Sequence, residues 1–196
     1  MIIVGVTGGI GSGKSTVAKT FHSMFGIPMY ISDDEAKLLM VNSVEIKSEL
    51  IDLFGEEAYL DGALNKPYIS HAIFNNKALL EQMNAIVHPR VAAHFKSWVD
   101  KQTSAYILKE AAILFESGAD RMCDYIITVT LDKATKIERL LKRDKTSVEK
   151  IESIMKQQWS DDERIAKSDY VIVNDTMAHM EQQVKEIHRE ILKKNK

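Results

Sequence analysis

The chain reads Gly8-Gly9-Ile10-Gly11-Ser12-Gly13-Lys14-Ser15 directly after its first apolar run. This octet satisfies the pattern G-x-x-x-x-G-K-[ST] of a phosphate-binding loop, or P-loop. Glycines allow successive backbone N–H groups to point into one concavity, where they hold phosphate oxygens. A helix that follows such a loop adds the positive end of its dipole. The pattern therefore assigns Lys14 to the terminal phosphates of ATP and the Ser15 hydroxyl to Mg²⁺.

The residues on either side of the loop support this interpretation. A β-branched run at residues 2–7 predicts a buried strand, and residues 15–25 predict a helix that Gly26 and Pro28 end. A chance glycine-rich turn followed by Lys-Ser is the alternative, and the strand before and the helix after the loop argue against it. The residues expected to bind the nucleotide are Gly9, Ile10, Gly11, Ser12, Gly13, Lys14, Ser15 and Thr16.

Further apolar runs at 27–31, 105–108, 125–129 and 170–173 predict four more strands. Apolar strands that alternate with helices indicate a parallel sheet covered on both faces. We therefore expect an α/β fold of three layers, a P-loop NTPase core with a five-stranded parallel sheet. The first strand should lie between the third and the fourth, and the second strand should lie at an edge.

The interval between the second and third strands breaks this alternation. Residues 34–101 contain no convincing buried strand, and helical patches stand at 36–40, 46–54, 68–74 and 79–87. A helical insertion of this length is interpreted as a substrate-binding subdomain, which leaves residues 1–33 and 102–196 as the nucleotide-binding core. A last helix at about 177–194 carries an apolar stripe that predicts core packing. The stripe consists of Met177, Met180, Val184, Ile187 and Ile191.

Composition limits the class of protein. The chain has 196 residues, of which 45% are apolar and 28% charged, and a net charge of -2 gives no sign of a nucleic-acid partner. Cys123 is the only cysteine, so no disulfide can form within the chain and a reducing compartment is expected. The apolar N-terminal run is too short to span a membrane, and no basic residue precedes it as in a signal peptide. We expect a soluble cytoplasmic protein with no membrane partner, either a monomer or a weak homo-oligomer.

Three classes of P-loop protein compete for this sequence: a small-molecule kinase, a GTPase switch, and a motor or transporter ATPase. A guanine-specific switch usually carries Asn-Lys-x-Asp, and the nearest stretch, Asn76-Lys77-Ala78-Leu79, lacks the aspartate. Motor and transporter ATPases usually place an aspartate after an apolar strand to hold magnesium, whereas the third strand here leads to Lys109-Glu110. These observations favour the kinase, which should consume ATP mainly when its acceptor is present.

A kinase must cover its phosphates during transfer, because water would otherwise compete as the acceptor. The basic stretch 133–145 has the composition of such a lid, which we extend to about residue 165. Arg139 and Arg143 are four residues apart and share one helix face, so their guanidinium groups could spread over the transferring phosphoryl. A solvated basic helix face is the alternative. The P-loop upstream and the strand directly before the stretch favour the lid.

Motifs along the whole chain are similar to those of one enzyme family. They are Thr7 to Ser15, Ser32-Asp33-Asp34-Glu35-Ala36-Lys37, Val87-His88-Pro89-Arg90-Val91, Ile113-Leu114-Phe115-Glu116, Arg139 with Arg143-Asp144, and then Gln158, Arg164 and Asn174. On these residues the chain resembles the dephospho-coenzyme A kinase family. The resemblance implies transfer of the γ-phosphoryl of ATP, with Mg²⁺, to the ribose 3′-hydroxyl of dephospho-coenzyme A, the last step of coenzyme A synthesis. Another small-molecule P-loop kinase, for a nucleoside or a sugar, is the alternative.

The resemblance also implies roles for single residues, and it makes 34–101 the coenzyme-binding subdomain. The implied catalytic residues are Asp33, Lys14 and Arg139. The implied substrate contacts are Asp33, His88, Arg90 and Glu110, and the further nucleotide contacts are Arg143 and Asn174.

The sequence departs from the family pattern at four places. Ile31 stands at the first aspartate of an Asp-Ala-Asp segment, of which Asp33 keeps the second. Glu110-Ala111-Ala112 replace Asp-Val-Pro, so a carboxylate is kept but is one methylene longer. Lys66 replaces an arginine, and Asp175 stands where the family has a glycine. None of these changes touches the P-loop or Asp33.

Some of these residues have a plainer interpretation from position alone. Asp33 comes between a predicted strand and a helix and could be an N-cap, although the carboxyl end of a strand beside a P-loop is also where ligands bind. Asp34 is its rival as the base, since the predicted start of a helix is uncertain by a residue or two. His88 precedes Pro89 and could be a turn residue, whereas the resemblance favours a role near the active cleft. Trp98, Trp159 and Cys123 are interpreted as packing residues.

Overall fold

The computed structural model describes residues 1–74 and 76–194. The chain forms two compact units, Met1–Ile31 with Gln102–Lys196, and Ser32–Lys101. We call the first the core unit and the second the helical unit, and each is described by itself. None of the helices in the described part of the chain combines the length and apolar content needed to cross a membrane.

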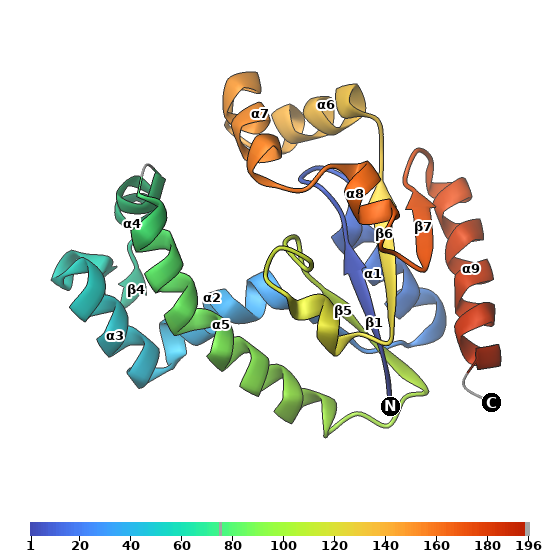
Figure 1. Cartoon of the computed structure of the whole chain (residues 1–196), viewed down its shortest axis with the longest axis horizontal. Coiled ribbons are helices and arrows are strands. Elements are labelled where there is room, and N and C mark those ends of the chain that lie inside the picture. Colours follow the sequence, from blue (N-terminus) through green and yellow to red (C-terminus); the bar gives the residue numbers. More distant parts are fainter. Residues whose placement is uncertain (75, 195–196) are drawn as a thin grey trace. The chain divides into compact units, whose positions relative to one another are not determined.

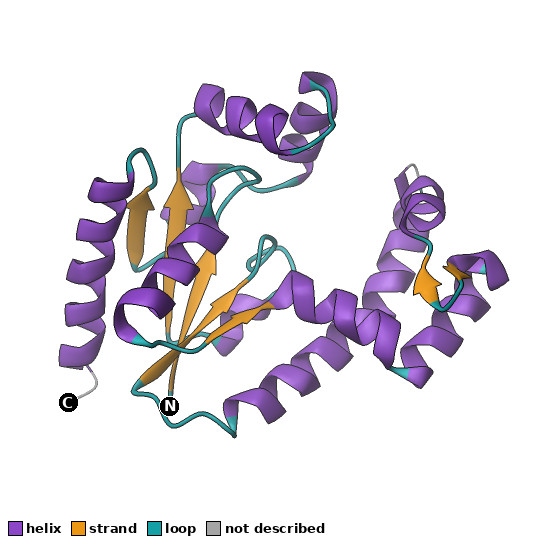
Figure 2. Ribbon diagram, turned by 180° about the vertical axis from the view of Figure 1, so that it is seen from behind, coloured by secondary structure: helices purple, strands orange, loops and turns teal. Residues whose placement is uncertain are grey.

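The core unit is built on a five-stranded parallel sheet in the order β2-β5-β1-β6-β7. Its strands are β1 (Ile2–Thr7), β2 (Met29–Ile31), β5 (Tyr106–Glu110), β6 (Tyr125–Thr130) and β7 (Tyr170–Val173). The predicted order is confirmed, with the first strand between the third and the fourth and the second at an edge. Figure 2 shows the strands as neighbouring arrows with helices on either side of the sheet.

The side chains of β1 alternate between the two faces of this sheet. Val4 and Val6 are fully buried in one core with α1 (Lys14–Phe25) and α9 (Met177–Lys194). Gly5 faces the other way, where a Cβ would lie 2.8 Å from Leu114 Cδ2 and 2.9 Å from Cys123 Sγ. Residues 111–123, which include the short helix η2 (Ala119–Met122), cover this second face together with α8 (Asp161–Ile165). The three-layer α/β prediction is therefore confirmed.

The last helix, α9, has the predicted bounds but not the whole predicted core stripe. Met180, Val184, Ile187 and Ile191 are buried against the sheet and α1. Met177 is 59% exposed, so its assignment to the core is wrong. It is the first residue of the helix, and its side chain lines a cavity beside the P-loop instead.

Two helices occupy the region predicted as a lid, α6 (Lys133–Arg143) and α7 (Val148–Gln157). Figure 1 draws them beyond the carboxyl end of β6, the strand from which α6 follows. The Asp132 carboxylate caps α6 by accepting a hydrogen bond from the Thr135 N–H at 2.9 Å. On this helix Leu140 is buried, whereas Leu141 is 42% exposed.

The helical unit contains α2 (Ser32–Asn42), α3 (Val44–Phe54), α4 (Lys66–Phe74) and α5 (Lys77–Val99), with the short helix η1 (Glu56–Ala58). Its core is separate and includes Met40, Ile46, Leu50, Phe54 and Val87. Residues 34–101 were expected to contain no convincing buried strand, and the strands among their described residues are the two-residue β3 (Tyr59–Leu60) and β4 (Ala63–Leu64), which form a small hairpin. Asp61 and Gly62 turn it with φ of 49° and 80°, as Asp-Gly hairpins do. Strands of two residues are too short to show an alternating pattern.

The interpretation of His88-Pro89 as a turn is wrong, because both residues lie inside the 23-residue helix α5. A proline removes one helical N–H and crowds the carbonyl four residues before it. The helix continues because α5 packs along α2, α3 and α4, and such packing contributes most of the stability of helices in proteins.

Candidate active site

The P-loop after β1 has a backbone that only glycine permits at two positions. A Cβ at Gly8 would lie 2.3 Å from the Val129 carbonyl oxygen. Gly13 has a φ of 85°, and a Cβ there would lie 2.0 Å from Asn174 Nδ2. The Gly13 carbonyl accepts hydrogen bonds from the Thr16 and Val17 N–H groups at 2.9 and 3.1 Å, so α1 begins directly at the loop. The positive end of the α1 dipole is therefore at the loop, as the sequence predicts.

Two side chains of the loop, Lys14 and Ser15, lie against one buried carboxylate. Glu110 ends β5 and is 2% exposed, and its Oε2 accepts a hydrogen bond from Ser15 Oγ at 3.2 Å. Its Oε1 lies 3.8 Å from Lys14 Nζ. The register of the sheet, which pairs Glu110 with Val6 of β1, brings the carboxylate to this point. A hydroxyl beside a carboxylate is the kind of oxygen donor set that Mg²⁺ takes, so these residues fit a divalent cation.

A cavity of about 360 Å³ opens beside this part of the loop. Its lining includes Lys14 from the loop and Arg139 and Arg143 from α6. The Arg139 Nη2 donates a hydrogen bond to the Asp175 carbonyl at 3.3 Å, and Arg143 binds the carboxylate of Asp144. Arg143 lowers the pKa of that exposed carboxyl. Three cationic side chains at one cavity next to a phosphate-binding loop favour a polyanionic ligand.

Asn174 fixes the shape of the loop from the end of β7. Its side chain is 6% exposed, and its Nδ2 donates a hydrogen bond to the Ser12 carbonyl at 2.8 Å. Its own backbone N–H donates to the Thr130 carbonyl at 3.0 Å, which ties the residue to β6. Asn174 therefore connects two strands of the sheet to the middle of the P-loop.

One face of α6 runs along the P-loop. A Cβ placed at Gly11 would lie 3.0 Å from Leu140 Cδ1, and one at Gly13 would lie 3.8 Å from Arg139 Nη1. At Gly9, a Cβ would lie 3.6 Å from Lys136 Nζ. Residues 136, 139 and 140 share one helical face because of their spacing of three and four. Side chains of α6 therefore approach three glycines of the loop, Gly9, Gly11 and Gly13.

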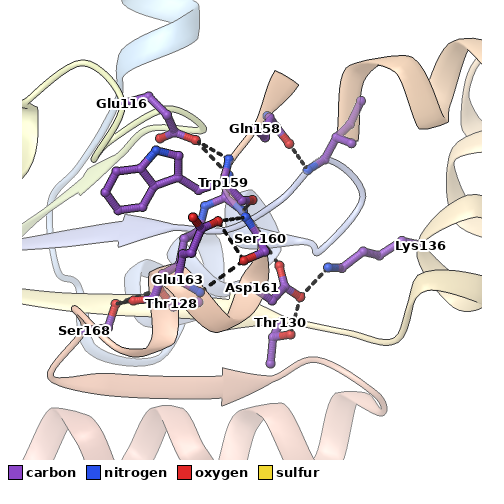
Figure 3. A network of polar contacts seen from close by, with 12 residues as sticks. Glu116, Thr128, Thr130, Lys136, Gln158, Trp159, Ser160, Asp161, Glu163 and Ser168 are labelled. Carbon is purple, nitrogen blue, oxygen red and sulfur yellow. Dashed lines mark hydrogen bonds and ion pairs between the residues drawn. The ribbon is translucent and has the colours of Figure 1, made fainter. Parts of the chain in front are cut away.

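A second polar cluster lies at the other end of the loop (Figure 3). The Ile10 N–H donates a hydrogen bond to Gln158 Oε1 at 2.9 Å. The Asp161 Oδ2 accepts hydrogen bonds from Lys136 Nζ and Thr130 Oγ1, both at 2.5 Å. A second cavity, of about 300 Å³, is bordered by Ile10, Lys136, Gln158 and Asp161.

Helix α8 holds this cluster in place. Ser160 and Glu163 form a capping box at its start, in which each side chain accepts a hydrogen bond from the backbone N–H of the other residue. Arg164 is 1% exposed, donates to Glu116 Oε1 at 3.0 Å and to the Trp159 carbonyl at 2.5 Å. The Trp159 ring stacks on Phe115 at a centroid distance of 5.3 Å, which agrees with its predicted packing role. The start of α8 is therefore fixed to the second face of the sheet.

The remaining predicted residues belong to the helical unit. Asp33 is exposed and is the second residue of α2, so its interpretation as an N-cap is wrong. The carboxylate of Asp34 is paired with Lys37 of the same helix at 2.7 Å. Arg90 binds Glu49 and donates to the Ile86 carbonyl at 2.8 Å, and His88 is exposed on α5.

Comparison with known proteins decides between the classes of P-loop protein. The family model described as dephospho-CoA kinase matches residues 2–180. The chain belongs to the dephospho-CoA kinase family. The dephospho-CoA kinase of Bacteroides fragilis is 40% identical over 175 residues, which cover 89% of this chain and 85% of the relative. That of Fusobacterium nucleatum is 36% identical over 190 residues, 96% of each chain. The crystal structure of TT1252 from Thermus thermophilus has a TM-score of 0.87 at 27% identity, with 96% of this chain and 97% of that chain covered.

The structure brings most of the residues predicted for a dephospho-CoA kinase site together in the core unit. The 360 Å³ cavity is lined by Gly11, Gly13, Lys14, Ser15, Thr16, Arg139, Arg143, Asn174 and Met177. Gly9 and Ile10 line the 300 Å³ cavity instead, and Ser12 is fully buried behind the loop. Glu110, predicted as a substrate contact, lies against Lys14 and Ser15.

Sequence reasoning gave no individual role to Lys136 or Asp161 and assigned Met177 to the core, whereas all three residues line cavities beside the P-loop. A signal for Lys136 exists, because it precedes Arg139 by three residues and Arg143 by seven and so belongs to their helical stripe. Asp161 has no comparable signal, since it is 25 residues from its partner Lys136 along the chain. The position of Met177 at the start of α9 is compatible with either the core or the cavity.

Proposed function

We propose that the protein transfers the γ-phosphoryl group of ATP to the ribose 3′-hydroxyl of dephospho-coenzyme A and releases coenzyme A and ADP. The observation that carries the proposal is the convergence of the P-loop, Arg139, Arg143 and Asn174 on one cavity in a chain of the dephospho-CoA kinase family. Phosphoryl transfer depends mainly on positioning and on charge stabilisation, and this cavity offers both.

We assign the triphosphate of ATP to this cavity. The loop N–H groups and the α1 dipole would hold the phosphates, while Lys14 supplies charge at the terminal ones. Arg139 would leave the Asp175 carbonyl, a neutral partner at 3.3 Å, for the more strongly binding oxygens of the transferring group. When bound, Mg²⁺ would be held by the Ser15 hydroxyl and would offset the charge of the phosphates. The Glu110 carboxylate, at the end of β5, would orient the side chains of Ser15 and Lys14.

We assign the role of general base to Asp33. Asp33 lies two residues after Ile31, which is paired with Glu110 in the sheet. The chain therefore leaves the sheet, directly before Asp33, at the strand end where Glu110 contacts Lys14 and Ser15. Among the described residues, Asp33 forms no ion pair, whereas Asp34 is paired with Lys37. A carboxylate suffices as the base, because the proton of the acceptor hydroxyl leaves only as the new bond forms.

We assign the binding of the coenzyme to the helical unit, with His88 and Arg90 of α5 among its contacts. The Arg90 guanidinium is part-buried and already held by Glu49 and by the Ile86 carbonyl, so its remaining donors are oriented before a ligand arrives. A guanidinium fork that is fixed in this way is suited to phosphate oxygens of the coenzyme.

A coupled ADP-release assay tests the acceptor. Dephospho-coenzyme A would be compared with adenosine, nucleoside monophosphates and gluconate at equal concentrations. We expect ADP release with dephospho-coenzyme A to exceed that with each other compound by at least about 100-fold, because buried polar groups reject acceptors that leave them unpaired. Equal or faster turnover with a nucleoside or with gluconate would assign the protein to another group of small-molecule kinases.

A further inference from the structure

The donor groups at the Gly9 end of the P-loop have protein acceptors in this structure. The Lys136 ammonium binds the Asp161 carboxylate, and the Ile10 N–H binds the Gln158 side-chain oxygen (Figure 3). Both acceptors come from the short segment 158–161 that ends α7 and begins α8. A cation and a backbone N–H facing one cavity are the two donor types with which P-loops hold phosphoryl oxygens.

Lys136 is placed close to the loop and away from solvent. Its side chain is 9% exposed, and its Nζ would lie 3.6 Å from a Cβ at Gly9. The same helical face carries Arg139 and Leu140, which approach Gly13 and Gly11. Lys136 therefore extends the cationic stripe of α6 by one turn toward the start of the loop.

The cavity at this end has an excess of positive charge. Four cationic side chains and two carboxylates line it: Lys133, Lys136, Lys156 and Arg164, with Glu152 and Asp161. Lys133 and Glu152 form an exposed pair of their own. An anionic group of a ligand is thus favoured in this space.

The Asp161 carboxylate has partners other than Lys136. It also accepts the Thr130 hydroxyl at 2.5 Å, and its Oδ1 lies 3.8 Å from Arg164 Nη1. When Lys136 moves to another acceptor, these two groups still compensate the part-buried carboxylate. The exchange of partners therefore avoids the large destabilisation that follows when a buried charge loses all of its partners.

From these contacts we infer that Lys136 is a further catalytic residue, whose ammonium leaves Asp161 and binds an oxygen of the γ-phosphoryl group of ATP. Until the nucleotide binds, the side-chain oxygens of Asp161 and Gln158 accept the hydrogen bonds that phosphoryl oxygens accept afterwards. The ammonium contributes its charge from the Gly9 end of the loop, opposite Arg139. This inference rests on the nucleotide part of the proposed function and is independent of the identity of the acceptor.

Calorimetric titration with ADP and with the β,γ-imido analogue of ATP, both with Mg²⁺ and without acceptor, tests this inference. Lys136→Gln should weaken binding of the analogue by about 10-fold to 100-fold, the range for one hydrogen bond to a charged group. Its binding of ADP, which lacks the γ-phosphoryl, should change by less than about threefold. Asp161→Asn keeps the ammonium and should bind the analogue at least as tightly as the unaltered protein.

Lys142→Gln is the matched control. Lys142 is on the same helix and is paired with the Glu138 carboxylate, but it is 75% exposed and does not line either cavity. Both affinities should be unchanged in this variant. If Lys136→Gln does not fold, the double variant Lys136→Gln/Asp161→Asn removes both charges and should show the same selective loss of analogue binding.

A purely structural ion pair gives a different pattern. Lys136→Gln and Asp161→Asn would then lower the melting temperature alike, and the ratio of analogue to ADP affinity would stay constant. That result would overturn the inference. Failure of the acceptor assay alone would leave the affinity ratio unaffected, so an error in the proposed acceptor and an error in the role of Lys136 are distinguishable.

Discussion

Replacement of Asn174 by alanine should weaken ATP binding through the shape of the P-loop. The Nδ2 of this residue donates to the Ser12 carbonyl at 2.8 Å, and both groups are buried. Alanine cannot donate this bond, so a carbonyl in the middle of the loop loses a partner. Asn174→Asp keeps the shape but sets a carboxylate oxygen against that carbonyl and adds negative charge to the cavity that is assigned to the phosphates.

The expected magnitude follows from this one bond. A buried polar group that is left without its partner costs about 1–3 kcal/mol. At about 1.4 kcal/mol for each factor of ten, this corresponds to an increase of about 5-fold to 140-fold in the Kd of ATP. The smaller increase in Kd applies if water from the cavity reaches the Ser12 carbonyl. The Kd of ATP should be higher in the aspartate variant than in the alanine variant.

Titration calorimetry with ATP and without acceptor measures this effect directly. Asn65→Ala is a matched control, because the Asn65 Nδ2 makes the same kind of bond to the Glu57 carbonyl at 2.9 Å within the helical unit. The control should lose a little thermal stability and keep its ATP affinity. An ATP Kd that is unchanged in both Asn174 variants would refute the claim that this residue shapes the loop.

Three further predictions concern the base, the lid and the pH dependence of stability. Asp33→Asn should lower kcat by about 100-fold or more, the scale for one general base, with near-normal ATP binding in calorimetry; full activity, with loss in Asp34→Asn instead, would move the base by one residue. Arg139→Ala should lower kcat more than it raises the KM of dephospho-coenzyme A, because its charge is needed most during transfer, and a change confined to KM in steady-state kinetics would make it a binding residue. Burial lowers the pKa of His188, whose Nδ1 contacts the Tyr106 hydroxyl at 2.7 Å, so the unfolded chain binds the extra proton more readily. Its contribution to stability is present above the ordinary histidine pKa of about 6.5 and is lost as the pH falls. Urea unfolding from about pH 7.5 to 5.5 should therefore show a smaller loss of stability in His188→Gln than in the unaltered protein, and parallel curves would contradict this.

The sequence predicts the architecture of the core unit because its signals are local. The glycine pattern at residues 8–15 identifies the loop, and the apolar runs identify the five strands. The strand order was predicted from the number of strands and the position of the P-loop after the first one. The bounds differ by a few residues, since β2 begins at Met29 rather than at residue 27 and β5 continues to Glu110. The hairpin around Asp61-Gly62 escapes detection because two-residue strands carry no periodicity.

The parts that the sequence does not predict depend on tertiary contacts. Pro89 looks like a break in the helix, and only the packing of α5 on its neighbours explains why the helix continues. The pairing of Lys136 with Asp161 joins residues on different helices, so no spacing rule reveals it. The contact of Glu110 with Lys14 and Ser15 follows from the register of β5 against β1, which a single sequence does not specify.

The most direct test of the account is the identity of the phosphorylated product. Incubation of the protein with ATP, Mg²⁺ and dephospho-coenzyme A, followed by mass spectrometry and ³¹P NMR, determines how many phosphates are added and on which hydroxyl. The account predicts one new phosphate on the ribose 3′-hydroxyl, and ADP formed in equal amount. ADP formation without a phosphorylated coenzyme, or a phosphate on the 2′-hydroxyl, would contradict it.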